Sequence, residues 1–399
     1  MSGERMEGAT AVGHLLRRAG FGATPGDLDE YRSLGYRKSV QKLLDEIDRP
    51  TPADPDGFDP YEPGAIQQLW LDRMRSGQAM LAEKLALFWH GHFANSNAKV
   101  QDAQLMWSQY RLFRSHGAGR FRQLVEKVSR DVAMIRFLDG NSNRKGIANE
   151  NYGRELQELF TLGIGNYTEK DIREIARAFT GFGCRHHDFV YSPEFHDDGE
   201  KTVHGQTGEF DGDDVIRIIT SLPACHRFIA GKLLRFFSHS NPTDGEIADL
   251  AKVLEKTGGD IRSTLFVLFH SPAFLSGAHH RVLIKSPVEF VVSARRATGA
   301  AGIPPWCHGA LERMGQILFR PPSVKGWTSG TGWLSAAGVV ERFKAARRFA
   351  QEAAPETADS ILDTAFDGSV PQALAQTLAE ASGRDRIALA LASPEFQLA

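Results

Sequence analysis

GRFRQLVEKVSRDVAMIRFL, residues 119–138, is the stretch that best indicates the fold class. Its apolar side chains recur at intervals of three and four, which places them on one stripe of an α-helix. The stripe begins with Phe121, Leu124, Val125 and Val128. Because an apolar stripe must be buried against other elements, we predict a long helix here that packs in the core of a helical bundle.

Helical spacing recurs on both sides of this stretch, whereas the alternation typical of strands is nearly absent. Several helix starts pair a hydroxyl with a carboxylate three residues later, as Thr24 does with Asp27. We predict helices at 25–34, 36–47, 64–77, 79–93, 101–115, 149–162, 168–181, 213–221, 223–236, 244–256, 259–270, 286–299, 306–319 and again from 336 onward. The sequence therefore predicts an all-α, multi-helix, bundle-like globular fold.

Two regions interrupt the helical pattern. Residues 182–212 are rich in Gly, His and Asp and predict one long irregular loop, with a short hairpin around 189–191. A loop rich in proline and aspartate at 49–63 marks a boundary. We predict an N-terminal helical segment at 1–63, a helical core with the candidate site at 64–335 and a C-terminal helical segment at 336–399, or alternatively one continuous domain.

The composition excludes several classes of protein. The 399 residues contain 47 Lys and Arg against 49 Asp and Glu, with no dense basic run, so we expect no binding to nucleic acid. No stretch reaches the roughly 20 apolar residues of a membrane-spanning helix, and residues 1–20 lack the apolar centre of a signal peptide. We expect a cytoplasmic protein without membrane contact. Cys184, Cys225 and Cys307 show neither a disulfide framework nor the spacing of a thiolate zinc site.

The densest group of ionisable residues lies within Asn149–Phe160. Glu150, Arg154 and Glu158 are spaced by four and would share one face of a helix. Carboxylates that are partly buried on such a face form metal or acid–base sites. The alternative is a solvated face with ion pairs within the helix.

Two further clusters contain histidine. His90 and His92 end an apolar helix, and both could turn toward one ion if Gly91 breaks that helix. His196 and Asp197 lie in the irregular loop and offer nitrogen and oxygen ligands. The alternatives are histidines that only pack in the core and a solvent-facing Asp/Gly turn.

These clusters lead to a first hypothesis, a metal-dependent enzyme. A divalent metal ion would activate water for hydrolysis or carry out oxidative chemistry. In this hypothesis Arg154 places a substrate anion, and Glu155 or Glu169 is the general base. The proposed metal ligands are His90, His92, Glu150, Glu158, His196 and Asp197.

Two other hypotheses belong to different classes. A metal-free enzyme would use paired carboxylates on a sugar-like substrate, with Trp327 and Trp333 stacking against the ring. Alternatively, the chain is a helical scaffold or partner-binding protein in which the same clusters are internal ion-pair networks. The first two hypotheses imply a small-molecule or saccharide-like substrate.

Nine segments resemble the large bacterial domain-of-unknown-function 1800 family. They are 14–22 (HLLRRAGFG), 89–93 (WHGHF), 149–163, 167–169 (YTE), 176–181 (ARAFTG), 196–197, 201–202, 285–290 (KSPVEF) and 321–327 (PPSVKGW). The resemblance spans nearly the whole chain and implies a helical fold without a known activity. Many members of that family look exported, whereas residues 1–20 of this chain carry no export signal.

Overall fold

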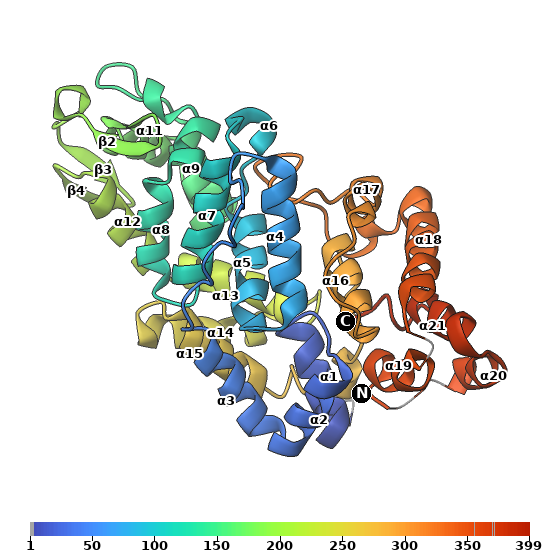
Figure 1. The fold of residues 1–399 in the computed structure, drawn as a ribbon. Coiled ribbons are helices and arrows are strands. Elements are labelled where there is room, and N and C mark those ends of the chain that lie inside the picture. Colours follow the sequence, from blue (N-terminus) through green and yellow to red (C-terminus); the bar gives the residue numbers. More distant parts are fainter. Residues whose placement is uncertain (1–3, 355, 369, 371) are drawn as a thin grey trace.

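The computed structural model describes residues 4–354, 356–368, 370 and 372–399, and helices dominate it, as the sequence predicts (Figure 1). The first half contains α1 (Gly8–Arg18), α2 (Pro25–Leu34), α3 (Tyr36–Glu46), α4 (Pro63–Ser76), α5 (Met80–His92), α6 (Asn97–Val100), α7 (Ala103–His116), α8 (Phe121–Ser129), α9 (Val132–Phe137), α10 (Asn151–Glu155) and α11 (Glu169–Ala178). The second half contains α12 (Gly212–Ser221), α13 (Pro223–Phe237), α14 (Asp244–Thr257), α15 (Ile261–His270), α16 (Pro287–Ala297), α17 (Trp306–Arg313), α18 (Ala336–Glu352), α19 (Thr357–Phe366), α20 (Gln372–Glu380) and α21 (Gly383–Ala392).

The long helix predicted over 119–138 is two helices, α8 and α9. Asp131 separates them, because its carboxylate accepts a hydrogen bond from the backbone N–H of Met134 and caps the start of α9. The amide of Gln109 on α7 donates to the same carboxylate at 2.6 Å. Aspartate favours a cap over a helix interior, so the apolar stripe continues across a break in the backbone.

The helix predicted over 149–162 begins as α10 and continues as a π-helical segment, η2 (Leu156–Thr161). The wider turn shows in the backbone bond from Leu162 N–H to the carbonyl of Gln157, five residues earlier, at 2.9 Å. Such π-helical turns are rare and often occur at functional sites. This one lies beside the end of α5, where the carbonyl of Phe160 contacts His92.

The irregular loop predicted over 182–212 contains two antiparallel hairpins. They consist of β1 (Phe182–Arg185) with β2 (Asp188–Tyr191), and β3 (Lys201–Val203) with β4 (Gln206–Gly208). The prediction placed a short hairpin at the first pair and missed the second. The turn between β3 and β4 has positive φ at both His204 and Gly205, the conformation of the tight hairpin turn that usually carries Asn-Gly.

Four of the helix starts that pair a hydroxyl with a carboxylate three residues later are capping boxes. They begin at Thr24, Thr168, Thr243 and Ser286. In each, the hydroxyl accepts the backbone N–H of the third helical residue, and the carboxylate of that residue accepts the N–H of the cap. The box at Ser286 fixes the start of α16, which contributes to the pocket described below.

One cluster of buried hydrophobic side chains extends from Met6 to Phe396 and crosses both boundaries that the sequence suggests. Figure 1 shows α3 below α5, and α18 beside α16 and α17. Both ends of the described chain pair with one segment: Met6 N–H donates to the carbonyl of Leu275, and Ala399 N–H donates to that of Leu283. Within the described residues, no helix has the length and apolar character needed to cross a membrane.

Candidate functional site

His90 and His92 do not face one another. They could turn toward one ion only if Gly91 broke the helix, and it does not, because α5 continues through Gly91 to His92. Side chains two residues apart in a helix point to nearly opposite sides. The two imidazoles therefore have separate surroundings.

His90 packs among aromatic rings. Its ring centroid lies 5.4 Å from that of Trp70 and 5.1 Å from that of Trp327. Its Nε2 accepts the backbone N–H of Phe319 at 3.0 Å. Burial lowers the pKa of His90 to about 3, so the imidazole is neutral at physiological pH. His90 thus holds the segment around Phe319 against α5.

His92 links α5 to η2 and α13. Its Nε2 lies 3.0 Å from the carbonyl oxygen of Phe160, and its Nδ1 lies 3.1 Å from Nζ of Lys232. Because a carbonyl can only accept, Nε2 carries the hydrogen and Nδ1 accepts from the lysine. Burial and the charge of Lys232 lower the pKa of His92 well below its usual value.

The face of Glu150, Arg154 and Glu158 is partly exposed and rich in ion pairs. Arg154 donates to both carboxylate oxygens of Glu169, at 2.9 and 3.0 Å, and to Glu150 at 3.2 Å. These bonds lower the pKa of Glu169. Glu158 instead accepts the hydroxyl of Tyr167 at 2.6 Å. Burial, together with the charge of Glu158, raises the pKa of the neighbouring Glu155.

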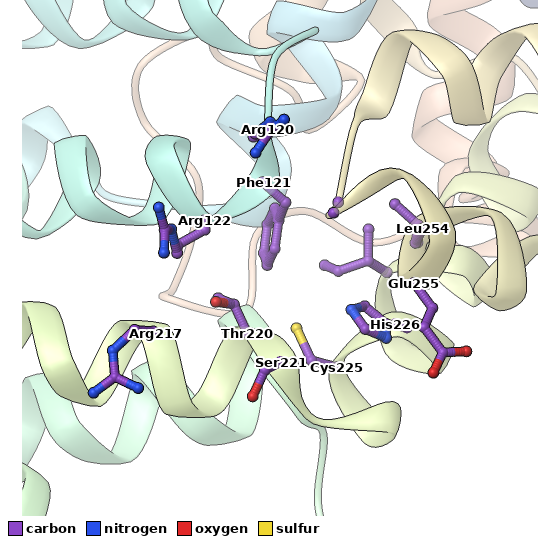
Figure 2. Close-up of a pocket in the computed structure, with 13 residues that line it drawn as sticks. Arg120, Phe121, Arg122, Arg217, Thr220, Ser221, Cys225, His226, Leu254 and Glu255 are labelled. Atoms are coloured by element: carbon purple, nitrogen blue, oxygen red, sulfur yellow. The ribbon is translucent and has the colours of Figure 1, made fainter.

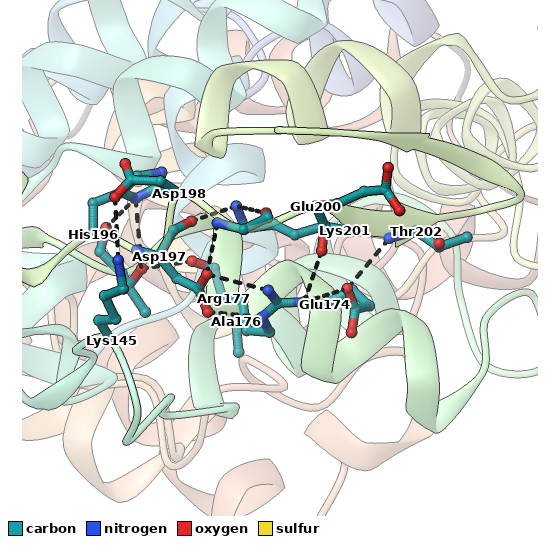
Figure 3. A network of polar contacts seen from close by, with 12 residues as sticks. Lys145, Glu174, Ala176, Arg177, His196, Asp197, Asp198, Glu200, Lys201 and Thr202 are labelled. Carbon is teal, nitrogen blue, oxygen red and sulfur yellow. Dashed lines mark hydrogen bonds and ion pairs between the residues drawn. The ribbon is translucent and has the colours of Figure 1, made fainter.

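His196 and Asp197 belong to a third group, shown in Figure 3. Asp197 accepts from Nε of Arg177 at 2.8 Å and from Nη2 at 3.1 Å, and these bonds lower the pKa of Asp197 to about 2. Nδ1 of His196 lies 2.9 Å from the carbonyl oxygen of Thr180. The group therefore joins the end of α11 to the loop before β3.

The proposed metal ligands thus have separate protein partners, and even His90 and His92 share none. Over the part of the chain that the structure describes, no group of three or more His, Cys, Asp and Glu residues is arranged to hold a metal ion. The geometry gives no shared centre for His90, His92, Glu150, Glu158, His196 and Asp197. Dependence on a divalent metal stays a prediction.

A different set of residues converges on one pocket of about 360 Å³, which we call the cationic pocket. This volume lies within the range of small-molecule sites. Of the described residues that line it, five are basic and one, Glu289, carries a side-chain carboxylate. The pocket is lined by Arg17, Arg18, Lys84, Leu87, Phe88, Gly91, His92, Lys232, Arg235, Phe236, Ser240, Leu283, Ile284, Ser286, Glu289, Gln316, Trp327, Thr328, Ser329, Gly330, Trp333 and Ala399.

The basic side chains of the pocket differ in how far they are neutralised. Arg17 forms an ion pair with Asp367, and Lys84 forms one with Glu289. Arg18 is 1% exposed and donates from Nη2 to the carbonyl of His279, but among the described residues its Nε and Nη1 have no hydrogen-bond partner. Burial and the charge of Arg17 lower the pKa of Arg18 to about 9. A buried guanidinium with free donors is costly unless an anion completes its hydrogen bonds.

Lys232 and Arg235 come from α13 and share one of its faces. Arg235 is exposed and has no ion pair among the described residues. Lys232 is partly buried, and besides His92 its Nζ contacts the carbonyl oxygen of Leu159 at 3.3 Å. Burial, together with the charge of Arg235, lowers the pKa of Lys232 to about 8.

Aromatic rings form part of the pocket wall. Trp327 is partly exposed, and Trp333 is 6% exposed. The loop that carries Trp327 is docked closely on α5, because a Cβ on Gly326 would lie 2.5 Å from the carbonyl oxygen of Gly91. The two tryptophans that the sequence suggested for stacking on a sugar ring therefore line the same pocket.

A second pocket of about 370 Å³ lies between α8, α12, α13 and α14 (Figure 2). Arg122 pairs with Glu126 at 3.3 Å, and Arg217 pairs with Asp214 at 2.9 Å. Cys225 is 1% exposed, and burial raises the pKa of its thiol, so it is not a thiolate nucleophile. This pocket has less uncompensated charge than the cationic pocket.

Sequence reasoning missed the basic residues of the cationic pocket. A signal was present, since Arg17 and Arg18 follow an apolar pair and Lys232 and Arg235 interrupt an apolar helix. Basic side chains within apolar helices require a partner or an aqueous cavity. The sequence, however, does not show that segments more than 200 residues apart meet.

A model of the family described as "Protein of unknown function (DUF1800)" matches residues 14–398. The chain belongs to the DUF1800 family. Comparisons with curated proteins and with solved structures gave no match. Four of the segments that resemble DUF1800 proteins line the cationic pocket: 14–22, 89–93, 285–290 and 321–327.

Proposed function

We propose that the protein binds an anionic, ring-bearing small molecule in the cationic pocket, such as a sugar with a phosphate or carboxylate group. The observation that carries this proposal is the convergence of five Lys and Arg side chains from α1, α5 and α13 with a single side-chain carboxylate, that of Glu289, among the described lining residues. The free donors of Arg18 point to the same ligand class, because guanidinium groups bind carboxylate and phosphate in bidentate fashion.

The aromatic wall supports the second part of the proposal, that the ligand carries a ring. Trp327 and Trp333 offer flat apolar faces beside the basic groups, and an indole can pack on a sugar or heterocyclic ring. In this arrangement the negative charge of the ligand is attracted to the basic side chains, and the ring of the ligand fits against the indole rings. The proposal keeps the saccharide-like substrate that the sequence suggested and adds a negative charge to it.

Isothermal titration calorimetry with glucose 6-phosphate, glucose and inorganic phosphate tests this proposal. We expect glucose 6-phosphate to bind, with an affinity that falls as salt screens the charges, and glucose to bind far more weakly. Arg235→Gln should weaken binding roughly tenfold, the worth of about one charge-assisted hydrogen bond. Trp327→Ala should weaken the binding of glucose 6-phosphate and leave the affinity for inorganic phosphate unchanged.

Arg120→Gln is the matched control, because Arg120 is also exposed but lines the second pocket. Binding of neither anion to the wild-type protein would reject the proposal. So would an equal loss of affinity in Arg120→Gln and Arg235→Gln. Metal-dependent catalysis and carboxylate acid–base catalysis stay predictions, and elemental analysis of the purified protein separates the two.

A further inference from the structure

Lys232 is the basic residue of the cationic pocket with the least usual surroundings. Its Nζ lies 3.1 Å from Nδ1 of His92, 3.3 Å from the carbonyl oxygen of Leu159 and 4.9 Å from the ring centre of Phe228. Among the described residues, no carboxylate forms an ion pair with this Nζ. The charge that acts on Lys232 is that of another cation, Arg235, one turn along α13.

Both hydrogen-bond partners of Lys232 are acceptors. The carbonyl of Leu159 can only accept, and Nδ1 of His92 accepts because Nε2–H is committed to the carbonyl of Phe160. Once the ammonium of Lys232 gives up a proton to water, the neutral amine has two N–H bonds, and these two acceptors take both of them. The lone pair of Nζ is then free of protein partners, on a side chain that lines the pocket.

We propose that Lys232 is the nucleophile of the cationic pocket and forms an imine with an anionic aldehyde or ketone. The proposal rests on the proposed function, because the basic side chains around Lys232 would hold the anionic group while the carbonyl carbon meets Nζ. Lysines removed from water and placed beside another cation are the ones that act in this way.

The reaction balances without an oxidant or a reductant. The lone pair of Nζ attacks the carbonyl carbon, and the π electrons of the C=O bond move to oxygen. The oxygen takes one proton from Nζ to give the carbinolamine. The second proton of Nζ then leaves with the hydroxyl group as water, and a C=N bond joins Lys232 to the substrate.

Borohydride trapping tests the proposal on the full-length protein. The protein is incubated with an equimolar amount of pyridoxal 5′-phosphate, a probe that combines an aldehyde, a ring and a phosphate, and is then reduced with sodium borohydride. Peptide mapping by mass spectrometry locates the reduced adduct. We expect most of the label on Lys232, and we expect excess inorganic phosphate to reduce that labelling at least tenfold.

Two variants complete the experiment. Lys232→Arg keeps the charge and should lose the adduct while it still binds inorganic phosphate, whereas Lys252→Arg, at an exposed site on α14, should label as the wild type does. If the wild-type protein binds phosphate but the label is spread over surface lysines, then Lys232 is not the nucleophile, and the proposed function still stands. Wild-type protein that binds no phosphate and labels without phosphate protection would overturn both.

Discussion

Individual residues show how burial changes what a side chain can do. His90 was predicted as a metal ligand from its residue type and its neighbour His92. The structure buries it among Trp70, Trp327 and Phe319, where its Nε2 accepts a backbone N–H. Sequence identifies such a histidine but gives neither its burial nor its partner, which depend on a segment 229 residues away.

The low pKa of His90 predicts a pH-dependent stability. The folded protein leaves His90 neutral down to a pKa of about 3, whereas the unfolded chain protonates it near pH 6.5. Below pH 6.5 the unfolded state therefore binds more protons, and acid lowers the free energy of unfolding. His90→Gln keeps an acceptor for Phe319 and does not titrate. The free-energy difference between wild type and variant should shift by about 2.3 kcal/mol between pH 6.5 and pH 4.5 in favour of the variant, because the unfolded histidine is already half protonated at pH 6.5.

Urea unfolding at the two pH values measures this shift. Other buried histidines, among them His14 and His92, are present in both proteins, so their contributions cancel. If the difference in unfolding free energy between wild type and variant is the same at both pH values, then His90 takes up a proton in the folded protein as readily as in the unfolded chain.

At the scale of elements, some boundaries of helices and strands were predictable from local sequence, and others were not. The capping boxes at Thr24 and Ser286 are visible in sequence because all their groups lie within four residues. The hairpin of β3 and β4 was missed because His204 occupies a left-handed position that usually holds asparagine or glycine. Asp131 was read as helical because its capping bond forms only when α9 turns away from α8.

The close contact between α5 and the loop that carries Trp327 leads to a prediction. Gly326 has a φ of 82°, and a Cβ there would lie 2.5 Å from the carbonyl oxygen of Gly91. Gly326→Ala therefore adds a backbone clash to the usual cost of a left-handed alanine, about 1–2 kcal/mol. We expect the substitution to move the loop off α5 and to weaken the binding of ring-bearing anions, measured by calorimetry, at least tenfold.

Gly315→Ala is the control for this change. Gly315 has a φ of 89°, and a Cβ there would contact nothing within 4 Å. It should lower the free energy of unfolding by about 1–2 kcal/mol through the backbone alone and leave binding unchanged. Equal effects of the two substitutions on stability and binding would mean that the contact with Gly91 does not position the loop.

At the scale of the whole molecule, the cationic pocket is a product of long-range folding. Its basic residues come from α1, α5 and α13, and its aromatic wall comes from the loop before α18. The sequence predicted α5 and α13 and singled out the two tryptophans, but it did not predict α1, and helical periodicity does not tell which helices meet. The three clusters chosen from sequence were dense along the chain, whereas the pocket is dense only in space.

A buried ion-pair cluster that includes Arg17 of this pocket joins the two halves of the chain. The side chain of Asp367, at the end of α19, is 3% exposed and accepts from Arg17 on α1 and from Arg281. These charges hold the pKa of Asp367 well below its usual range. Asp367→Asn keeps the left-handed backbone conformation that asparagine tolerates, but leaves two buried guanidinium groups without their anion. We expect the free energy of unfolding to fall by about 3–5 kcal/mol in urea titrations. Asp363→Asn on the same helix removes an exposed contact to Arg32 at 3.9 Å and should cost less than about 1 kcal/mol.

Because the hydrophobic core is continuous from Met6 to Phe396, we also expect the Asp367→Asn protein to unfold in one transition at lower urea. A separate early transition of the C-terminal helices would instead show that residues 336–399 fold as their own unit.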